Sequence, residues 1–252
     1  MLITGAGSNQ GIGFATAKML SALGAQVVIT STSDRIFDRT RDLGLDTSRA
    51  VVADLTNEAE AQHLLEVVQN ELGGLDVLVN NAGMTSVASP AETSNEVAPL
   101  INLQLSGFEK SIERNLTTAF LVTQKALPLL RNGEHSRIVM VSSVTGSVMA
   151  MRNDVAYATA KAGLIGMVRS LALDEARFGI TCNAVSPGWI ATASQLPHES
   201  EEGKHTPLGR SATAEEVASV ILFLSSREAS YVTGQNVIVD GGNSIQEERT
   251  QA

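Results

Sequence analysis

The sequence predicts a single α/β domain, residues 1–252, built on a doubly wound parallel sheet with helices on both faces. Two observations predict this fold class. Short apolar, β-branched segments alternate along the chain with longer segments of helical periodicity, and the connections between them are short. No linker, low-complexity segment or internal repeat interrupts the alternation, so the whole chain is expected to share one core.

Composition excludes several classes of partner. The formal net charge of -9 and the pI near 5.0 argue against binding to a nucleic-acid backbone or to an anionic membrane. No apolar run reaches membrane-spanning length, and the first residues lack the features of a signal peptide. The only cysteine, Cys182, has no partner for an intramolecular disulfide, and the histidines show no metal-ligand spacing. We therefore expect a cytoplasmic protein without a metal site.

The first strand ends at Thr4 and runs directly into a glycine-rich turn, GAGSNQGIG at 5–13, followed by a helix that stops at Gly24. Backbone N–H groups of such a turn, with the N-terminus of the next helix, can hold a pyrophosphate. The spacing differs from the common G-x-G-x-x-G, because five residues separate Gly5 from Gly11. The turn predicts either a dinucleotide site or only a tight bend, and its position before an amphipathic helix favours the first.

The residues after the second strand, VVIT at 27–30, bear on the choice of dinucleotide. An acidic residue at this strand end binds the ribose of NAD, whereas its absence with a nearby arginine accommodates the additional phosphate of NADP. Ser31 stands at the strand end and Arg35 follows it, which favours NADP. Asp34 is a nearby carboxylate and leaves NAD as an alternative cofactor. A further alternative is that the residues from Ser31 to Arg35 only cap the next helix.

Two further strands end in polar residues. The segment AVVADLT at 50–56 ends the third strand at Asp54 and offers Thr56 as a helix cap, while LDVLVNNAG at 75–83 leads into Asn81. Ligands of open parallel sheets bind beyond the carboxyl ends of the strands. The glycine turn and these strand ends are therefore expected to lie along one edge of the sheet.

The middle of the chain begins with a loop-like segment at 84–105. A capping box then predicts a helix that begins at Ser106 and carries Asn115, with a kink or break at Pro128. RIVMVSSV at 137–144 predicts a buried strand that ends in two hydroxyls.

The last part of the chain continues the alternation. A long helix ends near Gly179, and a buried strand after it ends at Pro187 and Gly188. Residues 189–209 are predicted to be irregular, as in a mobile lid. Thr213 opens a helix with a second capping box, and YVTGQNVIVDGG at 231–242 supplies the last strand.

Tyr157 and Lys161 are the candidates for chemistry. They stand four residues apart in a helical segment, and therefore on one face. A lysine ammonium one turn away favours the phenolate, so we expect it to lower the pKa of the tyrosine from its usual value of about 10. With Ser142 and Ser143 nearby to bind a substrate oxygen, the group suits carbonyl reduction or its reverse. Taken alone, the same pair could be an exposed aromatic and a solvated charge.

In these motifs the chain resembles the short-chain dehydrogenase/reductase family along its whole length, and most closely the β-ketoacyl-acyl carrier protein reductase branch. The resemblance implies a Rossmann-like fold. The matching stretches, in the order of the family, are TG…GIG (4–13), DLT (54–56), NNAG (80–83), RNLTTAF with Asn115, VSSV (141–144), YATAK (157–161), NAVSPGWIAT (183–192), PLGR (207–210) and YVTGQNVIVDGG (231–242).

The resemblance implies catalytic roles. Tyr157 would be the general acid, Lys161 would lower its pKa and hold the nicotinamide ribose, Ser143 rather than Ser142 would orient the substrate oxygen, and Asn115 would support a water chain behind the lysine.

The resemblance also implies a cofactor site made of backbone and small side chains. Besides Ser31, Arg35, Tyr157 and Lys161, the expected contacts are the pyrophosphate loop Gly5, Gly11, Ile12 and Gly13, the adenine contacts Asp54 and Leu55, the adenosine-ribose side Asn81, Ala82 and Gly83, and the nicotinamide side Pro187, Gly188, Ile190 and Thr192.

The chain departs from the pattern of the family in three places. The glycine loop has five residues where three are usual, the segment between 84 and 105 is long, and the first strand is short.

The expected activity is hydride transfer between NADP(H) and a ketone or secondary alcohol, with a 3-oxoacyl thioester or an apolar ketone as substrate. An NAD-dependent alcohol dehydrogenase and a non-catalytic nucleotide-binding redox sensor are the alternatives. The resemblance implies a homotetramer.

Overall fold

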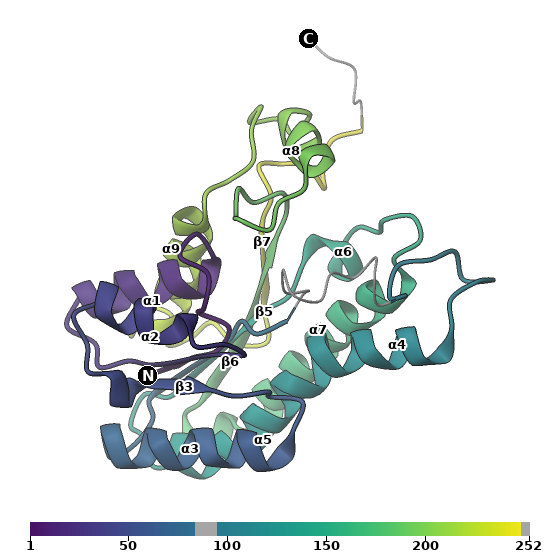
Figure 1. Ribbon diagram of the computed structural model, residues 1–252. Coiled ribbons are helices and arrows are strands. Elements are labelled where there is room, and N and C mark those ends of the chain that lie inside the picture. The colour runs from purple at the N-terminus through teal and green to yellow at the C-terminus, as the bar shows by residue number, and fades with distance from the viewer. Residues whose placement is uncertain (84–94, 248–252) are drawn as a thin grey trace.

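The computed structural model describes residues 1–83 and 95–247, and within these residues seven strands form one sheet in which every neighbouring pair is parallel (Figure 1). Their order across the sheet is β3-β2-β1-β4-β5-β6-β7. The bounds are β1 (Leu2–Ile3), β2 (Val28–Ser31), β3 (Ala50–Val52), β4 (Val77–Asn80), β5 (Arg137–Val141), β6 (Thr181–Pro187) and β7 (Asn236–Val239).

Helices cover both faces of the sheet (Figure 1). One face carries α1 (Ile12–Ala22), α2 (Arg35–Asp42) and α9 (Ala214–Ser225), and the other carries α3 (Glu58–Leu72), α5 (Thr118–Leu130) and α7 (Val155–Asp174). The other helical elements are α4 (Leu105–Ile112), α6 (Val144–Ser147), α8 (Pro197–Lys204), a π-helical turn (Glu113–Thr117) and two 3-10 turns (Thr47–Arg49 and Ala176–Phe178).

The strand pattern explains the two layers. Side chains alternate along a strand, so in β5 Ile138 and Met140 join the core under α3, α5 and α7, whereas Val139 and Val141 join the core under α1, α2 and α9. All four are buried. A strand buried on both faces is continuously apolar, as in parallel sheets covered by helices. The doubly wound α/β prediction is confirmed.

The strand order reverses between β1 and β4, because β2 and β3 follow β1 on one side and β4 begins the other side. This reversal opens a crevice beyond the carboxyl ends of β1 and β4, where ligands of open α/β sheets bind. The loop after Ile3 and the residues after Asn80 both start at this edge.

Several local predictions were wrong. The helix expected at Ser106 begins one residue earlier, behind Gln104, which makes no side-chain cap bond. Asn57 caps α3, because Thr56 instead donates its hydroxyl to Asp54 at 2.7 Å. Pro128 lies inside α5 and does not break it. The second capping box, at Thr213 and Glu216, is present as predicted.

The segment expected to be irregular at 189–209 contains the short helix α8. Its first residue is Pro197, and Glu199 accepts a hydrogen bond from the Leu196 backbone N–H at 2.7 Å. Proline at the first helical position and a carboxylate three residues after the cap are helix-start signals that the polar composition concealed.

Candidate active site

The carboxyl end of β5 and the first turns of α7 are tied together around Lys161. Its buried Nζ donates to the Val141 carbonyl, the last of β5, at 3.1 Å. The Ser142 hydroxyl donates to the Lys161 carbonyl at 2.9 Å. These two bonds place the face of α7 that carries Tyr157 and Lys161 over the sheet edge, and the Lys161 nitrogen lies 5.5 Å from the centre of the Tyr157 ring.

The two serines after β5 have different surroundings. Ser142 is buried and its hydroxyl is used by the α7 backbone. The Ser143 hydroxyl accepts from the Thr145 N–H at 3.2 Å and lies close enough to the Tyr157 hydroxyl to lower the pKa of the phenol. Ser143, rather than Ser142, is therefore the serine beside the phenol.

The expected lowering of the Tyr157 pKa is wrong for the chain without ligands. The pKa of Tyr157 is raised to about 12, mainly by burial; the Ser143 hydroxyl opposes this rise, and the negative charges of Asp154 and Glu199 contribute to it. Burial also lowers the pKa of Lys161 to about 8. Desolvation of both groups outweighs the attraction that the four-residue spacing predicted.

Asn115 lies in the π-helical turn between α4 and α5, and π-turns inside helices occur frequently at functional sites. Its side-chain nitrogen donates to the Ser111 carbonyl at 3.0 Å. The Asn115 side-chain oxygen and the Lys161 nitrogen both lie beside Gly83. A β-carbon built on Gly83 would lie 3.0 Å from the Asn115 oxygen and 3.4 Å from the Lys161 nitrogen. The structure thus brings Asn115, Lys161 and the end of the NNAG turn together.

The glycine turn forms a cradle without side chains. A β-carbon at Gly13 would lie 2.7 Å from the Gly5 carbonyl oxygen and 2.5 Å from the Asn81 amide nitrogen, so no larger residue fits. Asn81 donates that nitrogen to the Thr4 and Gly5 carbonyls, at 3.0 Å each. Gly11 occupies the N-cap position of α1, and Ile12 is the first residue of the helix. Backbone N–H groups at this helix start suit a pyrophosphate.

The residues expected on the adenosine side lie after β2 and β3. The Ser31 hydroxyl donates to the Ser33 carbonyl at 2.8 Å, and the exposed Arg35 donates to the Ser33 hydroxyl at 3.2 Å. Asp54 accepts from the Thr56 N–H and hydroxyl. Leu55 differs from its neighbours, because its side chain is buried in the core and only its backbone remains for a ligand.

The residues expected on the nicotinamide side follow β6. Pro187 ends the strand, and the Gly188 N–H donates to the Val239 carbonyl at 2.9 Å. Ile190 forms an isolated bridge with Ala212, and the Thr192 hydroxyl pairs with that of Ser194 at 3.0 Å. The partly buried Ala82 N–H donates to the Thr4 hydroxyl at 2.9 Å on the other side of the crevice.

Three groups at the site were missed from the sequence. Thr4 accepts from both the Asn81 and Ala82 N–H groups, which locks the NNAG turn to the end of β1. Gly7 passes so close to β2 that a β-carbon would lie 2.8 Å from that of Ser31. Asp154, at the N-cap position of α7, has its pKa raised to about 6 by burial. The sequence held a signal for each group: Thr4 directly precedes the glycines, Gly7 is the second glycine of GAG, and Asp154 is a carboxylate three residues before Tyr157.

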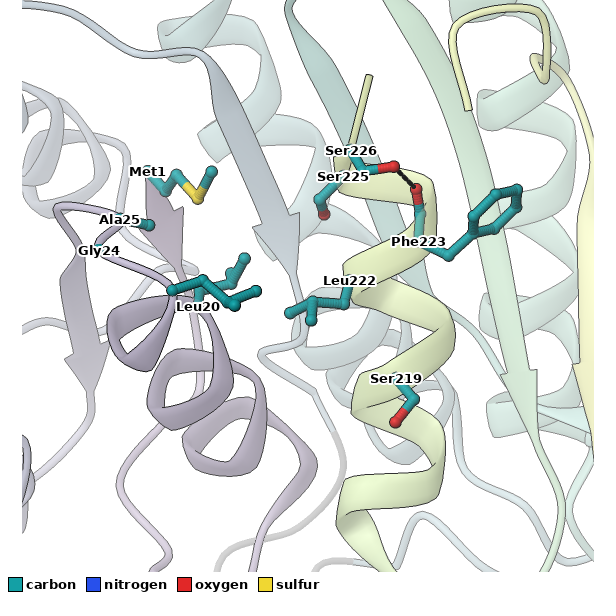
Figure 2. A pocket seen from close by; sticks show the side chains of 10 residues that line it. Met1, Leu20, Gly24, Ala25, Ser219, Leu222, Phe223, Ser225 and Ser226 are labelled. Atoms are coloured by element: carbon teal, nitrogen blue, oxygen red, sulfur yellow. Dashed lines mark hydrogen bonds between the residues drawn. The ribbon is translucent and has the colours of Figure 1, made fainter. Parts of the chain in front are cut away.

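A separate cavity of about 530 Å³ opens between α1 and α9. Figure 2 shows Met1, Leu20 and Leu222 facing it, and Ser226 donating to the Phe223 carbonyl at 2.7 Å. The cavity lies at the amino end of β1, away from the edge that carries Tyr157, and its lining is mainly apolar. It is therefore not the site of the chemistry.

The described residues contain no group of three or more histidine, cysteine or carboxylate side chains suited to a metal ion. In the same part of the chain, none of the helices has the length and hydrophobicity needed to cross a bilayer.

Comparison with known proteins places this site in a family. A family model described as enoyl-(acyl carrier protein) reductase matches residues 5–244. The 3-oxoacyl-(acyl-carrier-protein) reductase FabG of Escherichia coli K12 is 35% identical over 245 residues, covering 96% of this chain and 95% of the relative. The oxidoreductase UcpA of Salmonella typhimurium is 34% identical over 260 residues, covering 98% and 94%.

Among solved structures, the ligand-free aldohexose dehydrogenase of Thermoplasma acidophilum superposes with a TM-score of 0.84 at 30% identity, covering 100% of this chain and 96% of that one. Full-length similarity at this level, together with the fold and the site geometry, shows that the chain belongs to the short-chain dehydrogenase/reductase family of NAD(P)-dependent oxidoreductases that act on CH–OH groups.

Proposed function

We propose that the protein transfers hydride between NADP(H) and a ketone or secondary alcohol, with a 3-oxoacyl thioester or an apolar ketone as the substrate. One observation carries the proposal. The Tyr157 hydroxyl lies beside Ser143, close enough for that hydroxyl to lower the pKa of the phenol, and beside the buried Lys161, at the sheet edge where the glycine cradle also opens. A proton donor, a second hydroxyl and a cation at a nucleotide crevice are the groups that carbonyl reduction needs.

The cradle fits a dinucleotide, because its close backbone approach at Gly13 leaves N–H groups and a helix start facing the crevice. The pyrophosphate would lie on Gly5, Gly11, Ile12 and Gly13. The remaining cofactor would contact Ser31 and Arg35, Asp54 and the Leu55 backbone, Asn81, Ala82 and Gly83, Tyr157 and Lys161, and Pro187, Gly188, Ile190 and Thr192.

Bound NADPH would supply the hydride. The pKa of Tyr157, raised to about 12 by burial, keeps the phenol protonated, which is the state that a proton donor requires. The Tyr157 hydroxyl then donates its proton to the substrate oxygen while Ser143 holds that oxygen. Lys161, with a pKa near 8, remains a cation at neutral pH and stabilises the phenolate left behind. Such proton transfer typically contributes about 10²–10⁴ in rate. Asn115 would anchor the water chain that returns the proton.

Apolar side chains around the start of α7 favour an apolar substrate. Val148, Met151 and Val155 are exposed large hydrophobic residues close in sequence to Ser143 and Tyr157. FabG is named for 3-oxoacyl thioesters, and the solved relative for aldohexoses. A panel of substrates would separate these classes. Ketones, ketoesters, and 3-oxoacyl and enoyl thioesters are assayed with NADPH and with NADH, and aldohexoses are assayed with NADP and with NAD.

Tyr157→Phe tests the assignment. The substitution keeps the ring and removes the proton donor, so we expect turnover of any accepted ketone to fall by about 10³-fold or more. NADPH binding, followed by fluorescence titration, should stay nearly unchanged. Retained turnover would remove Tyr157 from the acid role. If the wild-type chain binds NADPH but turns over nothing in the panel, the non-catalytic redox sensor becomes the better account.

The NADP preference has its own test. Arg35 is the exposed cation beside Ser31 and Ser33, so Arg35→Ala should weaken NADPH binding about tenfold and leave NADH binding unchanged. Fluorescence titration of both cofactors gives the two dissociation constants. Tighter binding of NADH by the wild-type chain would favour the NAD-dependent alternative, in which Asp34 contacts the ribose.

The proposed assembly is a homotetramer formed through α4, α5, α7 and the C-terminal strand. The proposed location of the protein is the cytoplasm. Exposed apolar side chains on these helices, among them Leu105, Phe120 and Leu173, support the assembly. Cell fractionation of the producing organism tests the location.

A further inference from the structure

The three elements α4, the π-helical turn and α5 follow one another without a break from Leu105 to Leu130, and α7 runs beside them (Figure 1). The continuous helix from Leu105 to Leu130 carries Asn115 in its π-helical turn, and α7 carries Tyr157 and Lys161. How these two helices are held at the carboxyl edge of the sheet therefore sets the distance between Asn115 and the proton donor.

An ion pair lies immediately beside Asn115. Arg114 Nη1 is 3.2 Å from Glu96 Oε1, and the Glu96 side chain is only 4% exposed. The Arg114 backbone also approaches Gly83, where Asn115 and Lys161 converge. Because a buried carboxylate is costly unless it is paired, the pair ties Glu96 firmly to the turn that carries Asn115.

The segment that carries Glu96 reaches both helices. A β-carbon at Gly107, in the first turn of α4, would overlap the Asn95 carbonyl oxygen, so backbone and backbone are in contact there. Two residues after Glu96, the Ala98 N–H donates to the Asn153 carbonyl at 3.0 Å. Asn153 directly precedes the N-cap of α7 and has a positive φ of 63°. The segment thus bridges the start of α7 and the turn at Asn115.

We propose that Glu96 and Arg114 are a positioning pair for the proton relay: their buried ion pair, with the Ala98–Asn153 hydrogen bond, holds Asn115 in register with Tyr157 and Lys161. The inference rests on the proposed carbonyl reduction. Neither residue touches the substrate oxygen in this assignment, and both act through Asn115. Glu96 belongs to the lengthened segment before α4, whereas Arg114 lies in the π-helical turn after it, so the pair joins this segment to the turn that carries Asn115.

The same two helices provide a matched control at their opposite ends. Arg131, directly after α5, makes two hydrogen bonds to Glu175, directly after α7, at 2.7 and 2.8 Å. The Glu175 side chain is also 4% exposed. Glu175→Gln therefore removes an equally buried charge from a pair that links the same helices about 27 Å along α7 from Tyr157, at 1.5 Å per residue.

The experiment compares Glu96→Gln, Arg114→Gln, the double variant and Glu175→Gln with the wild type on one accepted ketone. The assay temperature is set below the melting temperature of the least stable variant. We expect Glu96→Gln and Arg114→Gln each to lower kcat about tenfold, because small misplacements of catalytic groups are expensive, with KM and the NADPH dissociation constant changed less than about threefold. The double variant should be no slower than the slower single variant, because one interaction is lost in all three. Glu175→Gln should lower the melting temperature but leave kcat within about twofold.

Two results would overturn the proposal: a Glu96→Gln enzyme with the kcat of Glu175→Gln, or single effects that multiply in the double variant. If the glutamine variants do not fold, Glu96→Asp, which keeps the charge and withdraws it by one methylene, decides by the same kcat readout. A wild-type chain that reduces no ketone would instead contradict the proposed function, so the two failures are distinguishable.

Discussion

Lys161 and Tyr157 show how burial changes the meaning of a residue pair. Spacing alone predicts that the cation lowers the pKa of the phenol, yet burial moves both groups toward their neutral forms, Tyr157 to about 12 and Lys161 to about 8. A phenol that stays protonated is a competent donor, and the proposed reduction needs the phenolate to be favourable only as the proton leaves. The pair is therefore suited to stabilise a transient charge rather than a resting one.

Asp154→Asn tests the electrostatics of this face through stability. Burial raises the pKa of Asp154 from 3.8 to about 6, so the folded chain binds this proton more tightly than the unfolded chain does. The stability from the protonated carboxyl is fully present below about pH 4 and is lost as the pH rises through about 6. At neutral pH the ionised group destabilises the fold by on the order of 1 kcal/mol, since it is only partly buried.

The asparagine variant should therefore melt about 2–4 °C higher than the wild type near pH 7.5, and the difference should vanish near pH 4. Differential scanning calorimetry at both pH values measures it. An equal gain at both pH values would show that the effect does not come from ionisation of Asp154, and helix capping is not expected to contribute because Asn and Asp are comparable caps.

At the scale of elements, the sheet edge is built by loops that lock one another. The Thr4 hydroxyl at the end of β1 holds the turn after β4, and Asn81 in that turn holds the glycine loop before α1. The two strands on either side of the order reversal thus share one hydrogen-bonded corner. The long glycine loop keeps this corner despite its additional residues, because Gly5 and Gly13 still meet at contact distance.

Gly13→Ala tests this corner. The added methyl group would lie 2.7 Å from the Gly5 carbonyl oxygen, which belongs to the backbone and cannot rotate away. We expect a loss of about 1–3 kcal/mol of stability from overpacking and a weakening of NADPH binding by about tenfold or more, because the loop and the first turn of α1 must separate. Gly74→Ala is the control, since nothing lies within 4 Å of its added carbon and its φ is not positive. Equal behaviour of the two variants would show that the corner is not tight.

At the scale of the whole molecule, the helices that carry the catalytic candidates also carry exposed apolar surface. Leu173 near the end of α7 is 81% exposed and Phe120 on α5 is 46% exposed. Exposed large apolar side chains on these helices support the proposed interface. The proposed tetramer would cover this layer and restrain α5 and α7 from outside, as the Arg131–Glu175 pair does from within.

Leu173→Asp tests the assembly. A charge at a covered apolar contact costs several kcal/mol when it is left unpaired, so the variant should dissociate toward dimers or monomers. Light scattering coupled to gel filtration gives the mass of each species. Leu23→Asp is the matched control, because Leu23 is 73% exposed but follows α1 on the other face of the sheet. A wild-type monomer, or equal loss of assembly in both variants, would contradict the proposed interface.

The sequence by itself determined the alternation of strands and helices, the parallel sheet and the strand ends at which the candidate residues lie. These follow from local periodicity and from glycine and capping signals, which depend on near neighbours in the chain. The same signals failed at Thr56, where Asn57 takes the cap, and at Ser106, where the helix begins behind Gln104 without a side-chain cap bond.

The tertiary structure alone decided that the Ser142 hydroxyl is used by the α7 backbone, that Leu55 turns into the core, and that desolvation raises the pKa of the phenol. It also joined Glu96 to Arg114 across a segment whose composition reads only as loop. These features depend on burial and on contacts between residues far apart in the chain, and no local pattern of residues encodes the dielectric environment that packing creates.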